Sequence, residues 1–130
     1  MQYLLDTNHA SAVFSYQLDL ASHPRATSAD QFGLPLPGIA ELWFMVFASA
    51  RLAKNQHRLL EIMPDFTQWP LDEKAAIEFG RIKAELKRIG RPIPDADVQI
   101  AAIARANKLT LLTADAHFNG ISDLSVENWI

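Results

Sequence analysis

Two short apolar runs, one near each end of the chain, finish at or just before an aspartate. Residues 1–5 are followed directly by Asp6, and residues 109–113 are followed by Asp115 after one intervening residue. Strands that are apolar at consecutive positions are typical of a parallel sheet with both faces covered. Because such runs alternate with helical patterns along the chain, the sequence predicts an α/β domain with a largely parallel sheet.

The spacing of apolar and turn-forming residues places the other elements. The longest expected helix is capped by Asp72 and runs to Ile89, because its apolar residues recur every three or four positions and Gly90 follows it. The first helix is expected to begin at a cap formed by Thr7 or Asn8 and to reach residue 16. Further helices are expected over residues 39–54, 56–63 and 95–107, and strands over residues 2–5, 66–71, 110–113 and 125–129.

Composition narrows the class of protein. With 130 residues, the chain is expected to form a single domain over residues 1–130. Hydrophobic residues make up 49% and charged residues 21%, and no stretch nears the roughly 18–20 apolar residues that span a membrane. The absence of cysteine excludes disulfides and thiolate metal sites, and without a visible signal peptide we expect a cytoplasmic location. The formal charge of -3 disfavours nucleic-acid binding by bulk attraction alone.

Four carboxylates stand where strands are expected to end or helices to begin. Asp6 and Asp115 follow strands, whereas Glu41 and Asp97 open helical patterns. In a parallel α/β sheet the carboxyl ends of the strands meet at one edge, where ligands bind. Acids gathered there repel one another unless a cation lies among them, and oxygen ligands without cysteine indicate Mg²⁺ or Mn²⁺. The sequence therefore predicts Asp6, Glu41, Asp97 and Asp115 as metal ligands and catalytic residues.

Each acid alone also has an ordinary explanation as a helix cap, a first-turn residue or a turn former. The prediction depends on the four acids taken together. A divalent ion held by them can activate water and neutralise charge on a phosphodiester, and metal-dependent hydrolysis of a phosphodiester needs no nucleophilic side chain. Of the two neighbouring aspartates, we expect Asp97 to bind the metal. We expect Asp95 either to cap the helix or to orient the metal ligands without binding the metal itself.

Polar residues beside the acids are weaker candidates. Thr7, Asn8 and Thr113 are expected either to orient the carboxylates or to act as local caps. His117 follows Asp115 by two residues and is either a phosphate contact or an ordinary surface histidine.

Four segments form a pattern larger than any single motif. They are Leu4-Leu5-Asp6-Thr7-Asn8, Ile39-Ala40-Glu41-Leu42, Asp97-Val98-Gln99-Ile100-Ala101-Ala102, and Leu112-Thr113-Ala114-Asp115 with Phe118. Together they resemble the PIN-domain ribonucleases, and within these most closely the VapC toxins of bacterial toxin–antitoxin modules. The resemblance extends to the closing Val126-Glu127-Asn128-Trp129, so it covers essentially the whole chain.

This resemblance implies a fold, an activity and partners. The fold is a three-layer α/β/α domain with a mostly parallel sheet of four to five strands. The activity is Mg²⁺- or Mn²⁺-dependent cleavage of RNA by metal-activated water, with the family's acidic positions on Asp6, Glu41, Asp97 and Asp115. The partners are an RNA substrate, a cognate antitoxin and a second copy of the chain, and no membrane is involved.

The segment before Glu41 departs from the family pattern. VapC-like chains usually carry a β-rich run with serine or threonine there, whereas this chain has Leu34-Pro35-Leu36-Pro37-Gly38. Residues 22–38 contain three prolines and two glycines, so we expect mostly loop and a displaced start for the helix of Glu41.

Two other interpretations use the same acids. A signalling receiver domain is also an α/β unit with clustered acids and Mg²⁺, but it needs a lysine after a late strand, and none follows Asp115. The other is a PIN-like module that binds a partner without catalysis, and the intact set of acids argues against it.

Overall fold

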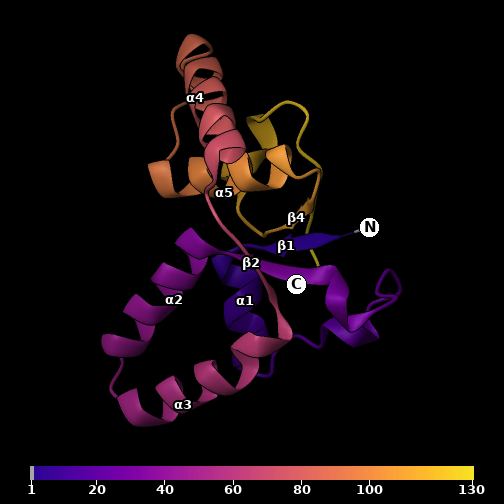
Figure 1. The fold of residues 1–130 in the computed structure, drawn as a ribbon, viewed down its shortest axis with the longest axis vertical. Helices are drawn as coiled ribbons and strands as arrows, with labels where there is room; N and C mark the ends of the chain where they lie inside the picture. The colour runs from indigo at the N-terminus through magenta and orange to yellow at the C-terminus, as the bar shows by residue number, and fades with distance from the viewer. Residues whose placement is uncertain (1) are drawn as a thin grey trace.

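The computed structural model describes residues 2–130, and Met1 of the first apolar run lies outside the described residues (Figure 1). In this part of the chain five strands form one sheet in the order β3-β2-β1-β4-β5, and every pairing is parallel. The strands are β1 (Tyr3–Leu5), β2 (Phe32–Pro35), β3 (Thr67–Trp69), β4 (Thr110–Leu112) and β5 (Val126–Glu127). The predicted α/β class with a mostly parallel sheet of four to five strands is confirmed.

Within residues 2–130, five α-helices cover the two faces of this sheet. They are α1 (Thr7–Phe14), α2 (Leu36–Phe47), α3 (Leu52–Ile62), α4 (Glu73–Arg88) and α5 (Asp95–Ala106). The first three lie on one side of the sheet and the last two on the other, which gives three layers (Figure 1). No helix of the described part of the chain combines the length and hydrophobicity that crossing a bilayer requires.

β1 shows why the strand sequences are apolar at consecutive positions. Leu4 packs into the core under α4 and α5, whereas Tyr3 and Leu5 pack into the opposite core under α1, α2 and α3. All three residues are 1% exposed or less. Because successive side chains of a strand point to opposite faces, a strand covered on both faces needs apolar residues throughout.

The prediction of a loop through residues 22–38 is wrong for its last part, where β2 lies between β1 and β3. At Gly33 a Cβ would lie 2.4 Å from Nε1 of Trp69 and 2.9 Å from the carbonyl oxygen of Thr67, so only glycine fits. Pro35 ends the strand, and Pro37 stands in the first turn of α2, where a missing N–H costs little. These residues therefore mark a close strand contact and a helix start.

Helix boundaries differ from the predictions at two places and agree at a third. The single helix expected over residues 39–54 is wrong, because α2 and α3 are separated at residues 48–51. α1 ends before Tyr16, whose φ of 61° is left-handed and cannot continue a helix. The prediction for α4 is confirmed: the side chain of Asp72 caps it, and Gly90, with a φ of 67°, follows it.

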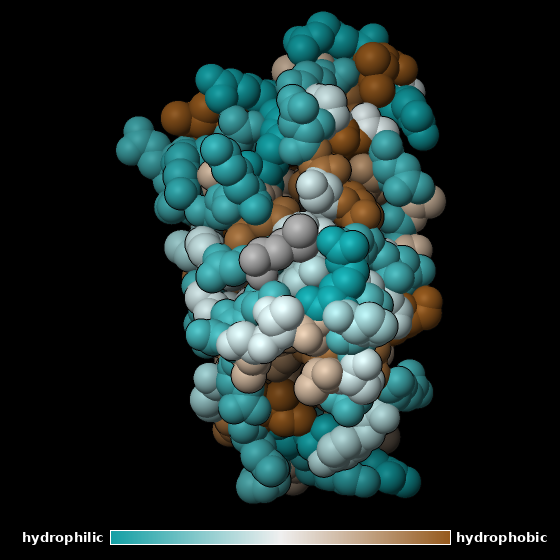
Figure 2. All heavy atoms as spheres, turned by 90° about the vertical axis from the view of Figure 1, so that its right-hand side faces the viewer, coloured by the Kyte–Doolittle hydropathy of each residue, from teal (hydrophilic) through white to brown (hydrophobic). Residues whose placement is uncertain are grey.

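The strand ends define two different sides of the molecule. Figure 2 turns to the viewer the right-hand side of Figure 1, where β1 begins. The surface seen there is mainly hydrophilic, with apolar atoms in separate small groups. The acidic residues that follow β1 and β4 stand at the opposite ends of these strands.

Candidate functional site

The strand order reverses between β1 and β4, at the centre of the sheet. The chain runs from β1 outward to β2 and β3, and then returns to the other side of β1 as β4. Leu5 and Leu112 are paired in register, and the backbone N–H of Asp6 donates to the carbonyl oxygen of Leu112 at 3.0 Å. Open α/β sheets bind ligands at the carboxyl ends of the strands beside such a reversal. Asp6 and the residues after Leu112 therefore meet where a ligand site is expected.

The carboxylate of Asp6 is buried, with 5% of the residue exposed, and it is held by three donors. Its Oδ1 accepts from the backbone N–H of Thr7 at 2.8 Å, so Asp6 caps α1. The cap expected at Thr7 or Asn8 is wrong, whereas the ordinary role of a helix cap that the sequence allowed for Asp6 is confirmed. Its Oδ2 accepts from the hydroxyl of Thr113 at 2.7 Å and from Nδ2 of Asn8 at 3.3 Å. Thr7, Asn8 and Thr113 thus all contact the acid beside which the sequence places them.

The surroundings of Asp6 disfavour the charged form of its carboxylate. Burial raises the pKa of Asp6, and the hydrogen bonds from Thr113 and Thr7 partly oppose the rise. The negative charges of Asp97 and Asp115 raise it further, so both lie close enough to repel Asp6. A cation among the three carboxylates would remove this penalty.

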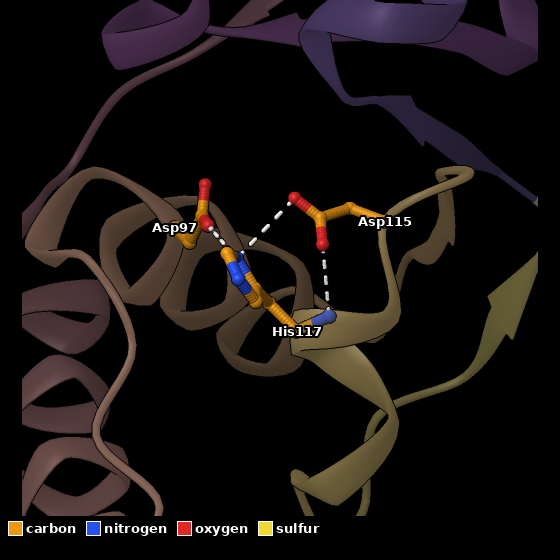
Figure 3. A group of neighbouring side chains, drawn as sticks. All are labelled: Asp97, Asp115 and His117. Carbon is orange, nitrogen blue, oxygen red and sulfur yellow. Dashed lines mark hydrogen bonds and ion pairs between the residues drawn. The ribbon is translucent and has the colours of Figure 1, made fainter.

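Three side chains, that of Asp97 from α5 and those of Asp115 and His117 from the segment after β4, point toward one another (Figure 3). Nδ1 of His117 lies 2.8 Å from Oδ2 of Asp97 and 3.3 Å from Oδ2 of Asp115. Asp115 also begins the 3-10 turn of Ala116–Gly120, because its Oδ1 accepts from the backbone N–H of His117 at 2.9 Å. The hydrogen bond to Asp97 and the charges of the nearby aspartates raise the pKa of His117.

Glu41 joins this site through Thr7, whose hydroxyl donates to its Oε2 at 2.7 Å. The expectation that Glu41 lies in the first turn of its helix is wrong. α2 begins at Leu36, directly after β2, so Glu41 lies in the second turn of the helix. Its exposed carboxylate is not a member of the compact group formed by Asp97, Asp115 and His117.

Asp95 has a different role from the expected one. The N-cap of α5 is Pro94, without any side-chain hydrogen bond, so the predicted cap at Asp95 is wrong. Oδ1 of Asp95 instead lies 3.0 Å from Nζ of Lys83 on α4, and both side chains are more than half exposed. The structure therefore turns Asp95 toward α4, while Asp97 turns toward the strand ends.

His9 is a residue of this site that the sequence did not reveal. It is completely buried, its Nε2 accepts from the backbone N–H of Trp129 at 3.0 Å, and its Nδ1 lies 2.7 Å from Oδ1 of Asn8. Because Oδ1 of Asn8 also accepts from the backbone N–H of Ala114, Nδ1 of His9 must carry the proton. Burial lowers the pKa of His9 to about 4. A neutral histidine thus ties the end of the chain to Asn8 and, through it, to Asp6.

The side chains present suit a divalent cation. Asp97, Asp115 and His117 each offer one ligand atom, and these atoms lie within 4.8 Å of one another. The carboxylate of Asp6 has about four acceptor directions and uses three of them for hydrogen bonds, which leaves one for an ion. Apart from the nitrogen of His117, these donors are carboxylate oxygens of aspartates, which Mg²⁺ and Mn²⁺ bind.

Comparison with known proteins gives a consistent result. The family model described as "PIN domain" matches residues 3–124. The "tRNA(fMet)-specific endonuclease VapC" of Shigella flexneri is 39% identical, and the match covers 99% of this chain and 98% of that protein. "Ribonuclease VapC2" of Haemophilus influenzae is 30% identical over 100% of this chain and 99% of its own length.

Solved structures show the same fold. The crystal structure of VapBC2 from Rickettsia felis, bound to a DNA fragment from its promoter, superposes with a TM-score of 0.87 at 27% identity and full coverage of both chains. That of DNA-bound VapBC from Salmonella typhimurium gives 0.91 at 23% identity, covering 100% of this chain and 99% of the other, and this likeness concerns the fold alone.

Proposed function

This chain belongs to the PIN-domain family, as a toxin ribonuclease of the VapC type, and we propose that Asp6, Glu41, Asp97 and Asp115 form its active site. We propose Mg²⁺ or Mn²⁺ as its cofactor and hydrolysis of RNA phosphodiesters as its reaction. The observation that supports this most directly is the close grouping of Asp97 and Asp115 beside the sheet reversal, with Asp6 near enough for their charges to raise its pKa. Family membership also removes the receiver-domain alternative.

In this proposal Asp6, Asp97 and Asp115 hold the ion. When bound, a divalent cation there lowers the pKa of water and neutralises negative charge on a phosphodiester. The chain's own contribution is to keep the carboxylates ionised and fixed. Thr113 and Asn8 do this for Asp6 through Oδ2, because hydrogen bonds to a carboxylate favour its charged form.

Glu41 has a different part in this proposal. Its exposed carboxylate is fixed by the hydroxyl of Thr7, the residue next to Asp6, so it extends the acidic surface toward solvent. We propose that Glu41 holds outer waters of the ion rather than the ion itself, since Mg²⁺ usually keeps several waters in protein sites. Loss of Glu41 should therefore weaken activity less than loss of Asp6 or Asp97.

The partners we propose are an RNA substrate, a cognate antitoxin and a second copy of the chain. The relatives' VapBC complexes support the antitoxin. The described surface offers apolar contact area on α2, where Phe44 is 70% and Phe47 61% exposed. Beside Met45 of the same helix lies a cavity of about 460 Å³ between α1, α2 and α3. Apolar surface of this kind suits a protein partner, and we propose the cytoplasm as the place of action.

The experiment compares metal-dependent RNA cleavage by the wild type with Asp6→Asn and Asp97→Asn. We expect each variant to lose at least about 100-fold in activity, because even outer partners of a metal site change activity by about 10–100-fold. Asp123→Asn is the matched control, since Asp123 is exposed and its φ of 55° suits asparagine equally well. Cleavage by both variants at the wild-type rate, or full activity after removal of divalent ions, contradicts the proposal.

A further inference from the structure

His117 holds a position that the four-acid site leaves unexplained. Its ring lies between the carboxylates of Asp97 and Asp115, with Nδ1 turned toward both (Figure 3). The turn that carries it begins at Asp115, which also binds the backbone N–H of His117. The same short segment therefore fixes the carboxylate and the imidazole relative to each other.

The distances match those of neighbouring ligands around one ion. An octahedral ion with bonds of about 2.1 Å places adjacent ligand atoms about 3.0 Å apart. Nδ1 of His117 lies 2.8 Å from Oδ2 of Asp97 and 3.3 Å from Oδ2 of Asp115, which bracket that value. The side chain of His117 is 48% exposed, against 18% for Asp97, so its ring can adjust without disturbing the core.

We propose that Nδ1 of His117 is a direct ligand of the divalent ion, together with Asp97 and Asp115, and that it shifts the site from Mg²⁺ toward transition-metal ions. This inference rests on the proposed function. Imidazole nitrogen suits transition metals, whereas Mg²⁺ is bound by carboxylates and water. Compared with a site of oxygens alone, this nitrogen strengthens the binding of Mn²⁺ relative to that of Mg²⁺.

The competing explanation is an ion pair without a role in metal binding. A protonated His117 would neutralise Asp97 and Asp115 and would have to leave before a cation entered. The two explanations predict opposite signs for the removal of the ring. If His117 is a ligand, its loss weakens binding of a transition-metal ion. If it is only a competing positive charge, its loss strengthens binding of every divalent cation.

The first measurement is calorimetric binding of Mn²⁺ and Mg²⁺ to the full chain, as wild type, His117→Ala and His57→Ala. His57 is an exposed histidine that pairs with Glu61 on α3, so it is a matched control. For His117→Ala we expect Mn²⁺ affinity to fall at least about tenfold, as for other losses around metal sites, with a smaller change for Mg²⁺. Unchanged or tighter Mn²⁺ binding by His117→Ala would overturn the inference.

The second measurement tests His117 without replacing it. Electron spin-echo modulation of Mn²⁺ bound to wild-type chain should show a directly coordinated nitrogen, and labelling histidine with ¹⁵N should change that signal. Bound Mn²⁺ without a nitrogen signal rejects the His117 inference and leaves the acidic site intact. If instead Mn²⁺ binds wild type and Asp97→Asn equally weakly, the proposed function fails as well, so the two failures are distinguishable.

Discussion

Replacement of Thr113 by valine should show how the fold keeps a buried carboxylate charged. Thr113 is 2% exposed, and valine preserves its shape while removing the hydroxyl. That hydroxyl donates to Oδ2 of Asp6 at 2.7 Å and accepts from the backbone N–H of Asp115 at 3.0 Å. The substitution therefore leaves one carboxylate oxygen and one N–H with fewer partners.

The expected loss of stability depends on pH. A hydrogen bond to a charged group contributes about 1.5–3 kcal/mol, and one between neutral groups about 0.5–1.5 kcal/mol. With Asp6 ionised, at pH 8, Thr113→Val should lower the free energy of unfolding by about 2–3 kcal/mol. The bond from Thr113 lowers the pKa of Asp6, so its extra stabilisation is present above that pKa and is lost as pH falls through it. Under acidic conditions the loss should shrink to about 1 kcal/mol.

Urea unfolding of wild type and Thr113→Val from pH 8 downward tests this reasoning. Thr110→Val is the control, since Thr110 is also buried and lies at the other end of the same strand, away from the acids. RNA cleavage by Thr113→Val should fall about 10–100-fold, because Asp6, which we propose to hold the metal, loses one of the three hydrogen bonds that orient its carboxylate. A loss of stability that is the same at every pH, or no larger than that of Thr110→Val, would refute the account.

Three further predictions concern residues around the sheet. Asp95→Asn should change the free energy of unfolding by less than about 1 kcal/mol, because it breaks only the exposed ion pair with Lys83. The variant should cleave RNA near the wild-type rate, and a loss of activity as large as that of Asp97→Asn would contradict this prediction. Gly33→Ala should cost about 1–3 kcal/mol in urea unfolding, because its Cβ would collide with Trp69, and an unchanged midpoint would exclude the collision. Burial lowers the pKa of His9 from 6.5 to about 4, so between these two pH values the unfolded chain binds more protons than the folded chain. The free energy of unfolding should therefore fall by about 3 kcal/mol as pH drops through this range. His9→Gln should lack this part of the decline, and parallel pH curves would show that His9 does not cause it.

Much of the fold could be predicted because its strands are buried on both faces. Consecutive apolar residues in β1 and β4 indicated a covered parallel sheet, and the spacing in α4 indicated one helix face. β2 was missed because glycine and proline usually disfavour a strand interior. Here Gly33 is required by the side chain of a neighbouring strand, Trp69, and that contact joins residues 36 positions apart. A local pattern cannot contain it.

The candidate site, like the fold, could be predicted only in part. The positions of Asp6 and Asp115 follow from the ends of two strands, and the structure brings both near Asp97. Which residues these side chains contact cannot be predicted from their positions in the sequence. Asp95 turns to Lys83 because α4 packs beside α5, and His9 meets Trp129 across 120 residues. Which way a side chain points depends on packing that only the folded chain supplies.

The location of the acids explains how one small domain tolerates their mutual repulsion. Asp6 follows the central strand, between two cores whose packing fixes the backbone, so its carboxylate cannot move away from Asp97 and Asp115. A surface loop carrying the same charges would relax and separate them. The rigid sheet thus keeps Asp6 within reach of the negative charges of Asp97 and Asp115, a repulsion that a divalent ion would relieve. Binding of the ion should therefore stabilise the whole fold, and Mn²⁺ at about 100 times its dissociation constant should add about 2.7 kcal/mol to the free energy of unfolding. An ion that activates cleavage without shifting the urea midpoint would show that the acids are not held in repulsion.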